Sequence, residues 1–480
     1  MASSLPIEHV GGVTYRVPRF GAMRVDAVFY ASPEIMDDLA REEYASLWQL
    51  VNVAALPGIV APALAMPDIH MGYGFPIGGV AAFDPDAGGV VSPGGVGYDI
   101  NCGVRLLRSE LSIEDVQQRQ EALADALWAA VPAGVGSGVA SQRLQRRDLR
   151  RVLEQGAAWM VEHGFGEGED LDDLESGGRL DGADPDAVSE RAMERGAPQL
   201  GSLGSGNHFL EVQAVDAVYD QEAAAALGLR EGEVTVLIHT GSRGLGHQVC
   251  SDHVGTFLKA ASRHGIDLPD KQLAAAPIDS DEGRGYLGAM AAAANYAFAN
   301  RQHVTDSVRR TFERVGFLPR DHGLRVVYDL GHNNAKFETH DGRRVLVHRK
   351  GATRAFGPGH PSLSERHRAT GQPVFVPGDM GRYSFVLAGT EEAMQASFGS
   401  SCHGAGRLMS RRRAKKEAKT RRIDDELAAR GILVRAANRA TLAEEMSDAY
   451  KDVADVVDVV ERAGLGRKVA RLRPMIVVKG

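Results

Sequence analysis

The chain has 480 residues, of which 44% are hydrophobic and 25% are charged, and its formal net charge at pH 7 is −8. This composition is ordinary for a water-soluble globular protein, and it excludes a protein coated evenly with positive charge for nucleic-acid binding. It leaves room for a local basic groove. No apolar run reaches the length of a membrane span, so we expect no membrane association.

Three cysteines, Cys102, Cys250 and Cys402, make an odd number, and the first residues lack the pattern of a signal peptide. Both features favour the reducing cytoplasm over a framework of disulfides. We interpret Cys250 and Met409 as residues of the packed core. The length allows several domains or one large enzyme domain, and no linker is distinct enough to divide residues 1–480.

Short apolar runs that end in glycine-rich polar turns predict the β-strands. In chain order they cover residues 79–83, 104–107, 234–238, 324–330 and 374–376. Predicted helices cover residues 113–130, 221–226, about 286–315 and 407–430. The acidic, glycine-rich residues 164–186 are expected to form an excursion on the surface. Because strands and helices mix without a regular βα period, the predicted fold is α+β, a single large mixed α/β domain rather than a Rossmann fold or a TIM barrel.

A lone histidine, His403, stands before Gly404-Ala405-Gly406, and a basic run follows at residues 411–422 with the sequence RRRAKKEAKTRR. The imidazole offers a nucleophilic nitrogen, and backbone N–H groups at a helix N-terminus beside it could hold phosphate oxygens. The basic run is either a solvated helix face or a surface for a polyanion. Together these features suggest phosphoryl or nucleotidyl transfer on a polyanionic substrate.

Five residues are candidates for metal ligands. Asp99 and Cys102 are three residues apart in GYDINCG, where the flanking glycines allow the turn to close around one cation. His208, His239 and His332 each lie near glycine and small polar residues at the predicted end of an element. Together they could bind two cations, with the thiolate as a bridge. A cysteine favours zinc or iron and a carboxylate tolerates manganese, so residue types leave the metal open.

Ten sequence blocks resemble, in the same order, those of the RtcB family of RNA-splicing ligases, from about residue 60 to the last residue. The blocks are PDIHMGYGFPIGG, GYDINCG, GSLGSGNHFLEV, HTGSRGLGHQ, DLGHNNAK, VHRKGATRAFGPG, PGDMG, SSCHGAGR, AYKDV and the terminal VKG. The number of blocks in register makes this resemblance far more specific than any single glycine-rich match.

The resemblance implies a single α+β domain of the RtcB-like type, in which strand-end loops converge on a dinuclear metal site. It also implies a ligase that joins an RNA 3′-phosphate or 2′,3′-cyclic phosphate to a 5′-hydroxyl, with GTP and two Mn²⁺ ions, in tRNA splicing or RNA repair. The implied partners are RNA with such ends, GTP and, as an open question, an activating archease-like protein.

The resemblance also implies residue roles. His403 matches the histidine that becomes guanylylated. Asp99, Cys102 and His208 match the ligands of one manganese, and Cys102 would bridge to a second that His239 and His332 complete. Glu211 suits the N1–H and N2–H edge of guanine. The implied nucleotide-binding residues are Asn207, His208, Phe209, Leu210, Glu211, His332, Asn333, Pro377, Gly378, Asp379, Met380, Ser384, His403, Gly404, Ala405, Gly406, Tyr450 and Lys479.

Two positions depart from the family pattern. Asp379 stands where a serine or threonine is usual, and a carboxylate beside a bound phosphate is repulsive unless it meets a metal or an arginine. Met446-Ser447 replaces the more usual Ala-Pro ahead of Tyr450. The first departure bears on nucleotide affinity, and the second on the loop before Tyr450.

Several alternatives stay open at this point. The same residues could serve a metal-dependent phosphodiesterase or phosphatase acting on RNA ends, which would need neither His403 nor Lys479. A non-catalytic RNA-binding module is disfavoured by the acidic net charge and the lack of an aromatic RNA-binding motif. Asp68 and His70 are either catalytic or part of a turn. Three further basic residues either grip RNA phosphates or pair with acids: Arg243, Lys336 and Arg349.

Overall fold

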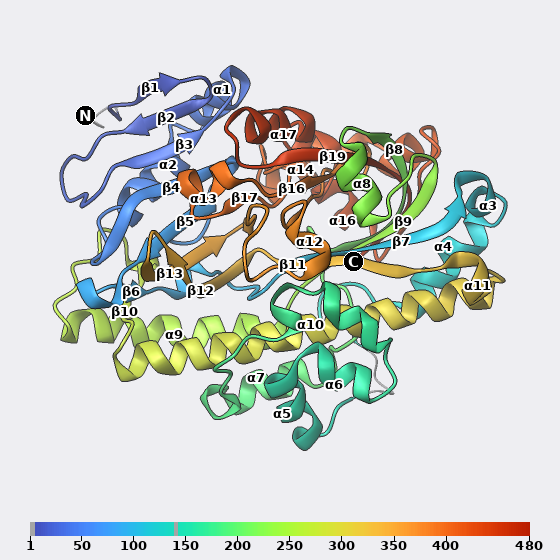
Figure 1. Ribbon diagram of the computed structural model, residues 1–480, viewed down its shortest axis with the longest axis horizontal. Helices are drawn as coiled ribbons and strands as arrows, with labels where there is room; N and C mark the ends of the chain where they lie inside the picture. Colours follow the sequence, from blue (N-terminus) through green and yellow to red (C-terminus); the bar gives the residue numbers. More distant parts are fainter. Residues whose placement is uncertain (1–4, 139–142) are drawn as a thin grey trace.

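Two large β-sheets form the framework of the computed structural model, which describes residues 5–138 and 143–480 (Figure 1). The seven-stranded sheet has the order β1 (Glu8–Gly11), β2 (Thr14–Val17), β3 (Ala27–Tyr30), β4 (Ile59–His70), β5 (Ile77–Phe83), β13 (Arg343–Lys350), β12 (Asn333–His340). The eight-stranded sheet has the order β11 (Arg325–Gly331), β7 (Gly103–Ser112), β9 (Glu233–Thr240), β8 (Phe209–Val218), β19 (Arg467–Lys479), β16 (Ser384–Ala388), β15 (Pro373–Val376), with β18 (Leu433–Ala436) beside β19. Two short pairs join β6 (Val90–Val91) to β10 (Ala276–Pro277) and β14 (Ala352–Arg354) to β17 (Ser400–Cys402).

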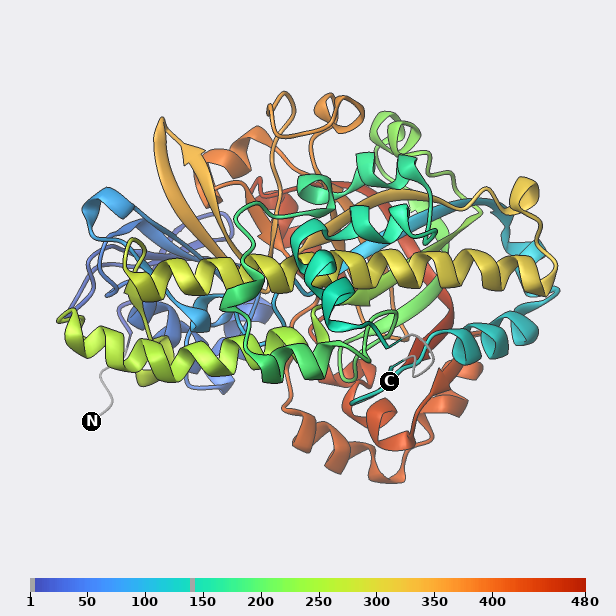
Figure 2. The ribbon, with the colours of Figure 1, turned by 90° about the horizontal axis from the view of Figure 1, so that it is seen from below.

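Two long helices, α9 (Arg243–Arg263) and α10 (Asp281–Val315), run beneath the sheets (Figures 1 and 2). The alanine-rich middle of α10 is buried, since α5 (Arg146–Gln155), α6 (Ala157–Glu162) and α7 (Glu190–Gly196) cover the pair from outside. Further helices include α1 (Pro33–Arg41), α2 (Ala45–Val53), α8 (Gln221–Leu227), α11 (Pro319–His322), α12 (Glu365–Arg368), α13 (Glu391–Ser397), α16 (Arg439–Glu444) and α17 (Val453–Arg462). Among the described residues, no helix is both long and apolar enough to cross a membrane.

The predicted mixed α/β architecture is confirmed, and each of the five predicted strands lies at a strand of the structure: β5, β7, β9, β11 and β15. The predicted helix at 113–130 is wrong as a single element. It is divided into α3 (Ile113–Gln117) and α4 (Gln120–Ala130). Arg119, at the break, leaves helical geometry, and its guanidinium donates to the carbonyl of Gly316 at 2.6 Å.

The predicted basic helix at 407–430 is also wrong. The segment forms α14 (Arg411–Glu417), one 3₁₀ turn η8 (Ala418–Thr420) and α15 (Ile423–Ala428). Arg407 instead lies in an extended bridge to Tyr450 and donates to Glu445 at 3.0 Å. No helix therefore begins directly after His403, and the expected phosphate cradle at a helix N-terminus is absent from this described segment.

The acidic residues 164–186 do not form a simple surface excursion. They contain the 3₁₀ turns η4 (Gly168–Asp173) and η5 (Glu175–Gly178), in which Asp170, Asp173 and Glu175 are buried. Arg309 of α10 makes two hydrogen bonds to the Asp170 carboxylate, at 2.7 and 2.8 Å. The acidic composition predicted side chains exposed to solvent, but these acids are buried because they pair with basic residues that are distant in the sequence.

A buried ion network ties α10 to the sheet ends. Arg301 of α10 and Arg105 of β7 both bind Asp329 of β11, with N–O distances of 2.8 and 2.7 Å. The Arg301 guanidinium also donates to the carbonyls of Asn101 and Thr240, at 3.0 Å each. Those two residues adjoin Cys102 and His239. The network therefore holds two strand ends at a fixed separation.

Candidate metal centre and adjoining cavity

The register of four neighbouring strands brings the candidate metal ligands together. Gly103, the first residue of β7, pairs with Thr240 at the end of β9 on one side and with Gly331 at the end of β11 on the other. Cys102 therefore lies between His239 and His332, each one residue from those pairs. On the far side of β9, Phe209 opens β8 opposite His239, which places His208 at the same edge.

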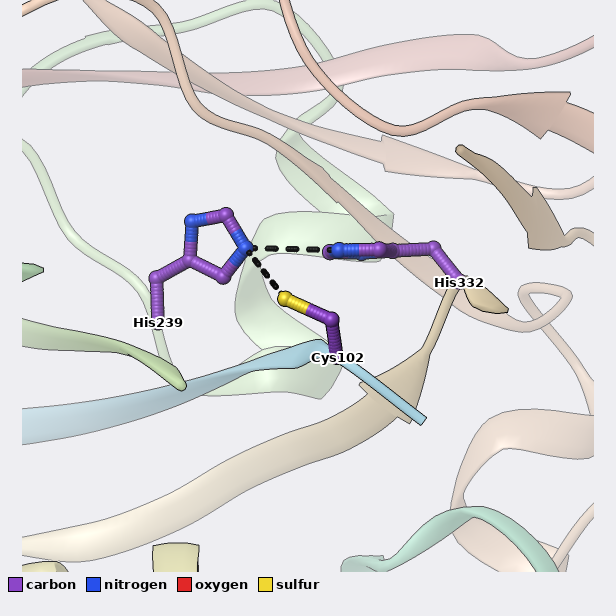
Figure 3. A group of neighbouring side chains, drawn as sticks. All are labelled: Cys102, His239 and His332. Carbon is purple, nitrogen blue, oxygen red and sulfur yellow. Dashed lines mark hydrogen bonds between the residues drawn. The ribbon is translucent and has the colours of Figure 1, made fainter. Parts of the chain in front are cut away.

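The five side chains form two groups that share the Cys102 sulfur, which we call the strand-end cluster: Asp99, Cys102 and His208, and Cys102, His239 and His332. The sulfur is 3.2 Å from Nε2 of His208 and 3.3 Å from Nε2 of His239. Nε2 of His239 is 3.3 Å from Nε2 of His332 (Figure 3). Nε2 of His208 lies 2.7 Å from the Asp99 carboxylate.

The surroundings of the strand-end cluster fit bound cations. The ligand atoms in each group lie within 4.8 Å of one another, and a set of thiolate, imidazole and carboxylate suits a transition metal. Two glycines keep the space open: a Cβ on Gly204 would lie 1.9 Å from Nδ1 of His208, and one on Gly241 would lie 2.5 Å from Asp99. A side chain at either position would displace a ligand.

Burial and neighbouring charge shape the protonation of the strand-end cluster. Burial lowers the pKa of His239 and of His332 well below the usual value, and nearby imidazoles add to the effect. Burial opposes ionisation of Asp99, but His208, Cys102 and Arg243 together outweigh it and bring the pKa of Asp99 to about 2. Burial, followed by the Asp99 charge, raises the pKa of the Cys102 thiol. Neutral imidazoles and a carboxylate can donate electron pairs at neutral pH, and a cation would favour the thiolate.

His403 stands beside the strand-end cluster, with its ring centroid 4.9 Å from that of His332. It follows β17 directly, and β17 pairs with β14, whose Ala352 donates its N–H to the carbonyl of His332. The buried Asp68 carboxylate lies 2.6 Å from Nδ1 of His403 and accepts its backbone N–H at 3.0 Å. Because Nδ1 is held in this way, Nε2 is the nitrogen left for reaction.

A cavity adjoins His403 and reaches the strand-end cluster at His239. Its walls come from β8, from the loop between β15 and β16, from the segment after β17 and from the end of β19. Of the predicted nucleotide-binding residues, those that line it are Asn207, Phe209, Glu211, Pro377, Gly378, Asp379, Met380, His403, Gly404, Ala405, Gly406, Tyr450 and Lys479. Segments far apart in the sequence therefore share this cavity.

Glu211 is a buried acid in the cavity wall. Burial raises its pKa to about 7, although Lys479 and a hydrogen bond from Gln213 act in the opposite direction. Nε2 of Gln213 donates to Glu211 at 2.7 Å and to Ser384 at 3.0 Å. Glu211 can accept hydrogen bonds from a ligand as a carboxylate or offer one O–H when protonated.

A second buried acid, Glu445, organises the opposite wall. It accepts the hydroxyl hydrogen of Tyr450, accepts from Arg407 at 3.0 Å and lies 3.6 Å from the ammonium of Lys479. The Lys479 ammonium also stands 5.6 Å from the centroid of the Phe209 ring. These contacts orient one phenol and two cations at the cavity.

The two departures from the family pattern contact each other. The hydroxyl of Ser447 donates to the Asp379 carboxylate, which also accepts the backbone N–H of Gly381 at 3.0 Å. Nε of Arg382 lies 3.4 Å from the other carboxylate oxygen. The charge of Asp379 is therefore balanced within the protein, and the carboxylate does not stand alone in the cavity wall.

Three predicted nucleotide-binding residues do not line the cavity. The Leu210 side chain lies in the core, because alternate residues of β8 face opposite sides and Phe209 and Glu211 take the cavity side. Ser384 lies behind Glu211, bound to Gln213. Asn333 bridges the backbone of Asp99 and Gly351, at 3.0 and 2.8 Å. Two further predicted residues, His208 and His332, lie in the strand-end cluster instead.

Two of the basic residues considered for RNA contact are committed elsewhere. Lys336 binds buried Glu175 at 2.6 Å, and Arg349 binds buried Glu338 at 2.6 Å. Arg243 is partly buried and donates to the carbonyl of Gly134 at 3.1 Å. For Lys336 and Arg349 the ion-pair interpretation is therefore the better one.

For other residues of the site the sequence carries weaker signals. Asp68 stood in a distinctive block, but nothing in the spacing separated a turn from a partner of His403. Glu445 and Gln213 carry no local signal, and the block that contains Arg407 gives no indication of its partner Glu445. Only the spatial arrangement reveals them.

The fold and the site define a protein of mixed α/β architecture with a candidate metal centre and an oriented histidine beside a polar cavity. The chain belongs to the RtcB family: the family model described as tRNA-splicing ligase RtcB matches residues 49–480. The tRNA-splicing ligase RtcB of Archaeoglobus fulgidus is 54% identical over 463 residues, covering 95% of each chain. The protein of the same name from Thermococcus kodakarensis is 52% identical over the full length of both, and the RNA-splicing ligase RtcB of Mycobacterium tuberculosis is 54% identical over 90% of this chain and all of its own.

Proposed function

We propose that this protein is a GTP-dependent RNA ligase that joins an RNA 3′-phosphate or 2′,3′-cyclic phosphate to a 5′-hydroxyl, in tRNA splicing or in RNA repair. The observation that carries the proposal is the position of His403, which is held by Asp68 between the strand-end cluster and the cavity. Membership of a family of tRNA-splicing ligases supports RNA as the substrate.

The strand-end cluster would hold two Mn²⁺ ions, one on Asp99, Cys102 and His208 and one on Cys102, His239 and His332. When bound, such ions supply charge neutralisation and Lewis acidity beside phosphate oxygens. The protein contributes the position of the site, because the register of β11, β7, β9 and β8 sets the separation of the ligands.

The cavity would hold the guanosine monophosphate part of GTP. Glu211 as carboxylate accepts hydrogen bonds from the N1–H and N2–H groups of guanine, and Phe209 adds apolar contact. The ammonium of Lys479 and the backbone of Gly404 to Gly406 lie in the same walls and suit the phosphate end. These contacts would hold the α-phosphate next to His403, so the transfer no longer depends on a chance encounter of the two groups.

His403 performs the first transfer. Nε2 attacks the α-phosphorus of GTP, a P–N bond forms, and the P–O bond to pyrophosphate breaks. The Asp68 carboxylate accepts a hydrogen bond from Nδ1–H, so the proton stays on Nδ1 and the positive charge that develops on the ring is stabilised. The product is a phosphoramidate, which is labile in acid and durable in base.

The RNA ends then react in two steps. An oxygen of the RNA 3′-phosphate displaces His403, so the P–N bond breaks and a phosphoanhydride forms. The 5′-hydroxyl attacks the 3′-phosphorus, loses its proton and expels GMP. A cyclic phosphate must first take up one water to become a 3′-phosphate. The histidine ends unchanged and can react again.

One experiment separates this function from a metal-dependent phosphodiesterase. The protein is mixed with α-³²P-labelled GTP and Mn²⁺, and the products are resolved on a denaturing gel. We expect acid-labile label on the wild type and none on His403→Ala. A wild type that takes up no label but still hydrolyses cyclic phosphate ends would establish the phosphodiesterase. A single domain over residues 1–480, a cytoplasmic location and an archease-like partner stay predictions.

A further inference from the structure

The eight basic residues of the run at 411–422 divide into two sets according to their partners. Five form ion pairs: Arg411 and Lys415 with Glu444, Arg413 with Glu417, Arg421 with Glu426 and Arg422 with Asp425. The other three, Arg412, Lys416 and Lys419, are exposed and form no ion pair or side-chain hydrogen bond with any described residue. An acidic protein thus leaves three cations of this run free.

These three cations lie along one side of α14 and η8, because their spacing of four and then three residues returns to the same face of a helix. Ala414 and Ala418 are buried on a different side of the same segment. Arg411, one residue before Arg412, lines the cavity that holds His403. The stripe of free cations therefore starts beside the cavity and leads away from it.

We propose that Arg412, Lys416 and Lys419 form a docking stripe for the phosphate backbone of an RNA strand whose end reaches His403. This inference rests on the proposed RNA ligase function. A row of unpaired cations binds phosphates by releasing counterions, whereas cations already paired with acids release few. The stripe would hold the strand without reading its bases.

The test compares two triple variants that remove the same charge: R412Q/K416Q/K419Q and the control R413Q/R421Q/R422Q. Affinity for a single-stranded RNA with a 3′-phosphate is measured at several salt concentrations. Each phosphate contact with a single strand contributes about 0.7 to the slope of log affinity against log salt. Loss of three contacts in the first variant should therefore make this slope shallower by about 2. The control should change it much less.

Equal slopes for both variants would overturn the docking stripe. Labelling with α-³²P GTP needs no RNA and should be the same in both variants. Label absent from the wild type would contradict the proposed function instead, so the two failures can be distinguished.

An independent observation concerns Lys451, whose side chain is only 4% exposed. Its ammonium donates to the carbonyls of Pro67 and Ile69, at 3.2 and 2.6 Å. Its backbone N–H donates to the carbonyl of Gly406 at 3.0 Å. One residue thus binds the segments on both sides of Asp68 and the end of the loop that begins with His403.

We infer that Lys451 is a positioning residue for His403. It holds the peptide on each side of Asp68, and Asp68 in turn makes two hydrogen bonds to His403. Four carboxylates favour the charged ammonium, those of Asp68, Asp38, Glu42 and Asp455. Loss of the ammonium would free the backbone that carries Asp68 and let the imidazole rotate or change its tautomer.

Chemical rescue of Lys451→Ala tests this role. Lys451 lines a second cavity of about 260 Å³, together with Asp38, Leu39 and Leu408, through which a small amine can enter. We expect the rate of GTP labelling of Lys451→Ala to fall by about 10- to 100-fold, with little change in the GTP concentration for half-maximal rate. Ethylammonium should restore the rate in Lys451→Ala and leave Asp68→Ala inactive.

A second readout needs no nucleotide. The imidazole ¹⁵N spectrum of His403 should show a proton held on Nδ1 in the wild type and a mixture of tautomers in Lys451→Ala, reversed by ethylammonium. If Lys451→Ala does not fold, Lys451→Gln replaces it in both measurements. An unchanged rate and spectrum in a folded variant, or a lower melting temperature alone, would overturn the positioning role.

Discussion

The strand-end cluster and the cavity beside it share a border at His403 but are built in different ways. The cluster takes its ligands from the ends of adjacent strands of one sheet and from the turns that adjoin them, so strand register and the turn from Asp99 to Cys102 bring them together. The cavity takes part of its wall from β8 and β19, which are neighbours in the eight-stranded sheet, and the rest from connecting segments, among them the loop that begins at His403 and the segment around Glu445 and Tyr450. The geometry of the strand-end cluster is thus set by backbone hydrogen bonds, whereas that of the cavity depends on side-chain contacts between segments.

This difference has a consequence for substitution. A ligand of the strand-end cluster can be removed without moving its neighbours, because the backbone ladder and the Arg301–Asp329 network keep the strand ends in place. A wall residue of the cavity, such as Glu445, holds several other side chains at once. We therefore expect loss of chemistry without loss of fold in the cluster and graded, coupled effects in the cavity.

The largest effect is expected for Cys102→Ala, which removes the ligand shared by both metal groups. Metal content measured by mass spectrometry of the Mn²⁺-loaded protein should show loss of both ions, and GTP labelling should fall by more than about 100-fold. Cys250→Ala is the matched control, since Cys250 is also buried but lies outside the cluster. Labelling that persists in Cys102→Ala would remove the bridging role of the thiolate.

The next effect is expected for Asp68→Asn, which keeps the size of the side chain. An amide cannot stabilise the positive imidazole, and it can donate to Nδ1, which favours the wrong tautomer of His403. We expect the rate of labelling to fall by about 10²- to 10⁴-fold, the usual range for an acid–base partner. Metal content should stay at the wild-type level. A rate within threefold of wild type, roughly the error of such assays, would contradict the role given to Asp68.

A smaller effect is expected for Glu211, in the pH dependence of the free energy of unfolding. Its pKa is about 7 in the folded protein, above the value of 4.5 for a free side chain. The folded state therefore keeps the proton longer, and stability falls as pH rises from about 4.5 to about 7. Relative to wild type, Glu211→Gln should gain about 3 kcal/mol across this interval and no more above it. Denaturant unfolding of the metal-free proteins measures the difference, and a pH-independent difference would contradict the raised pKa.

The smallest effect is expected for the pair Asp379 and Arg382. Because the carboxylate is balanced by Arg382 and by the Ser447 hydroxyl, Asp379→Ser alone should change GTP affinity little. Arg382→Gln leaves the carboxylate without its cation and should weaken GTP binding. A double-mutant cycle measured by calorimetry should give a coupling of about 1 kcal/mol, since Arg382 is partly exposed. Additive effects would show that Asp379 acts on the nucleotide directly.

The sequence predicted the strand-end cluster better than it predicted the cavity, for a physical reason. Apolar runs that end in His239 or before His332 carry a local signal, and the order of the strands then completes the geometry. The pairing of Asp379 with Ser447 spans 68 residues, and that of Arg407 with Glu445 spans 38. No local pattern contains such contacts.

The basic run and the acidic segment both differ from their predictions for the same reason. The basic run has high helix propensity along its length, but Arg421 turns toward Glu426 and Asp448, and the chain leaves helical geometry there. The acidic segment looked solvated, yet Asp170 and Glu175 meet Arg309 and Lys336 from distant elements. Propensity and composition describe a segment alone, whereas tertiary partners decide its final position.

The most direct measurement is peptide mapping of the protein after reaction with GTP and Mn²⁺, quenched in base and analysed by mass spectrometry. We predict guanosine monophosphate on the peptide that contains His403, bound through nitrogen, lost on mild acid treatment and absent from His403→Ala. Guanylate found on a lysine or another histidine, or no covalent nucleotide on a protein that still joins RNA ends, would contradict the account.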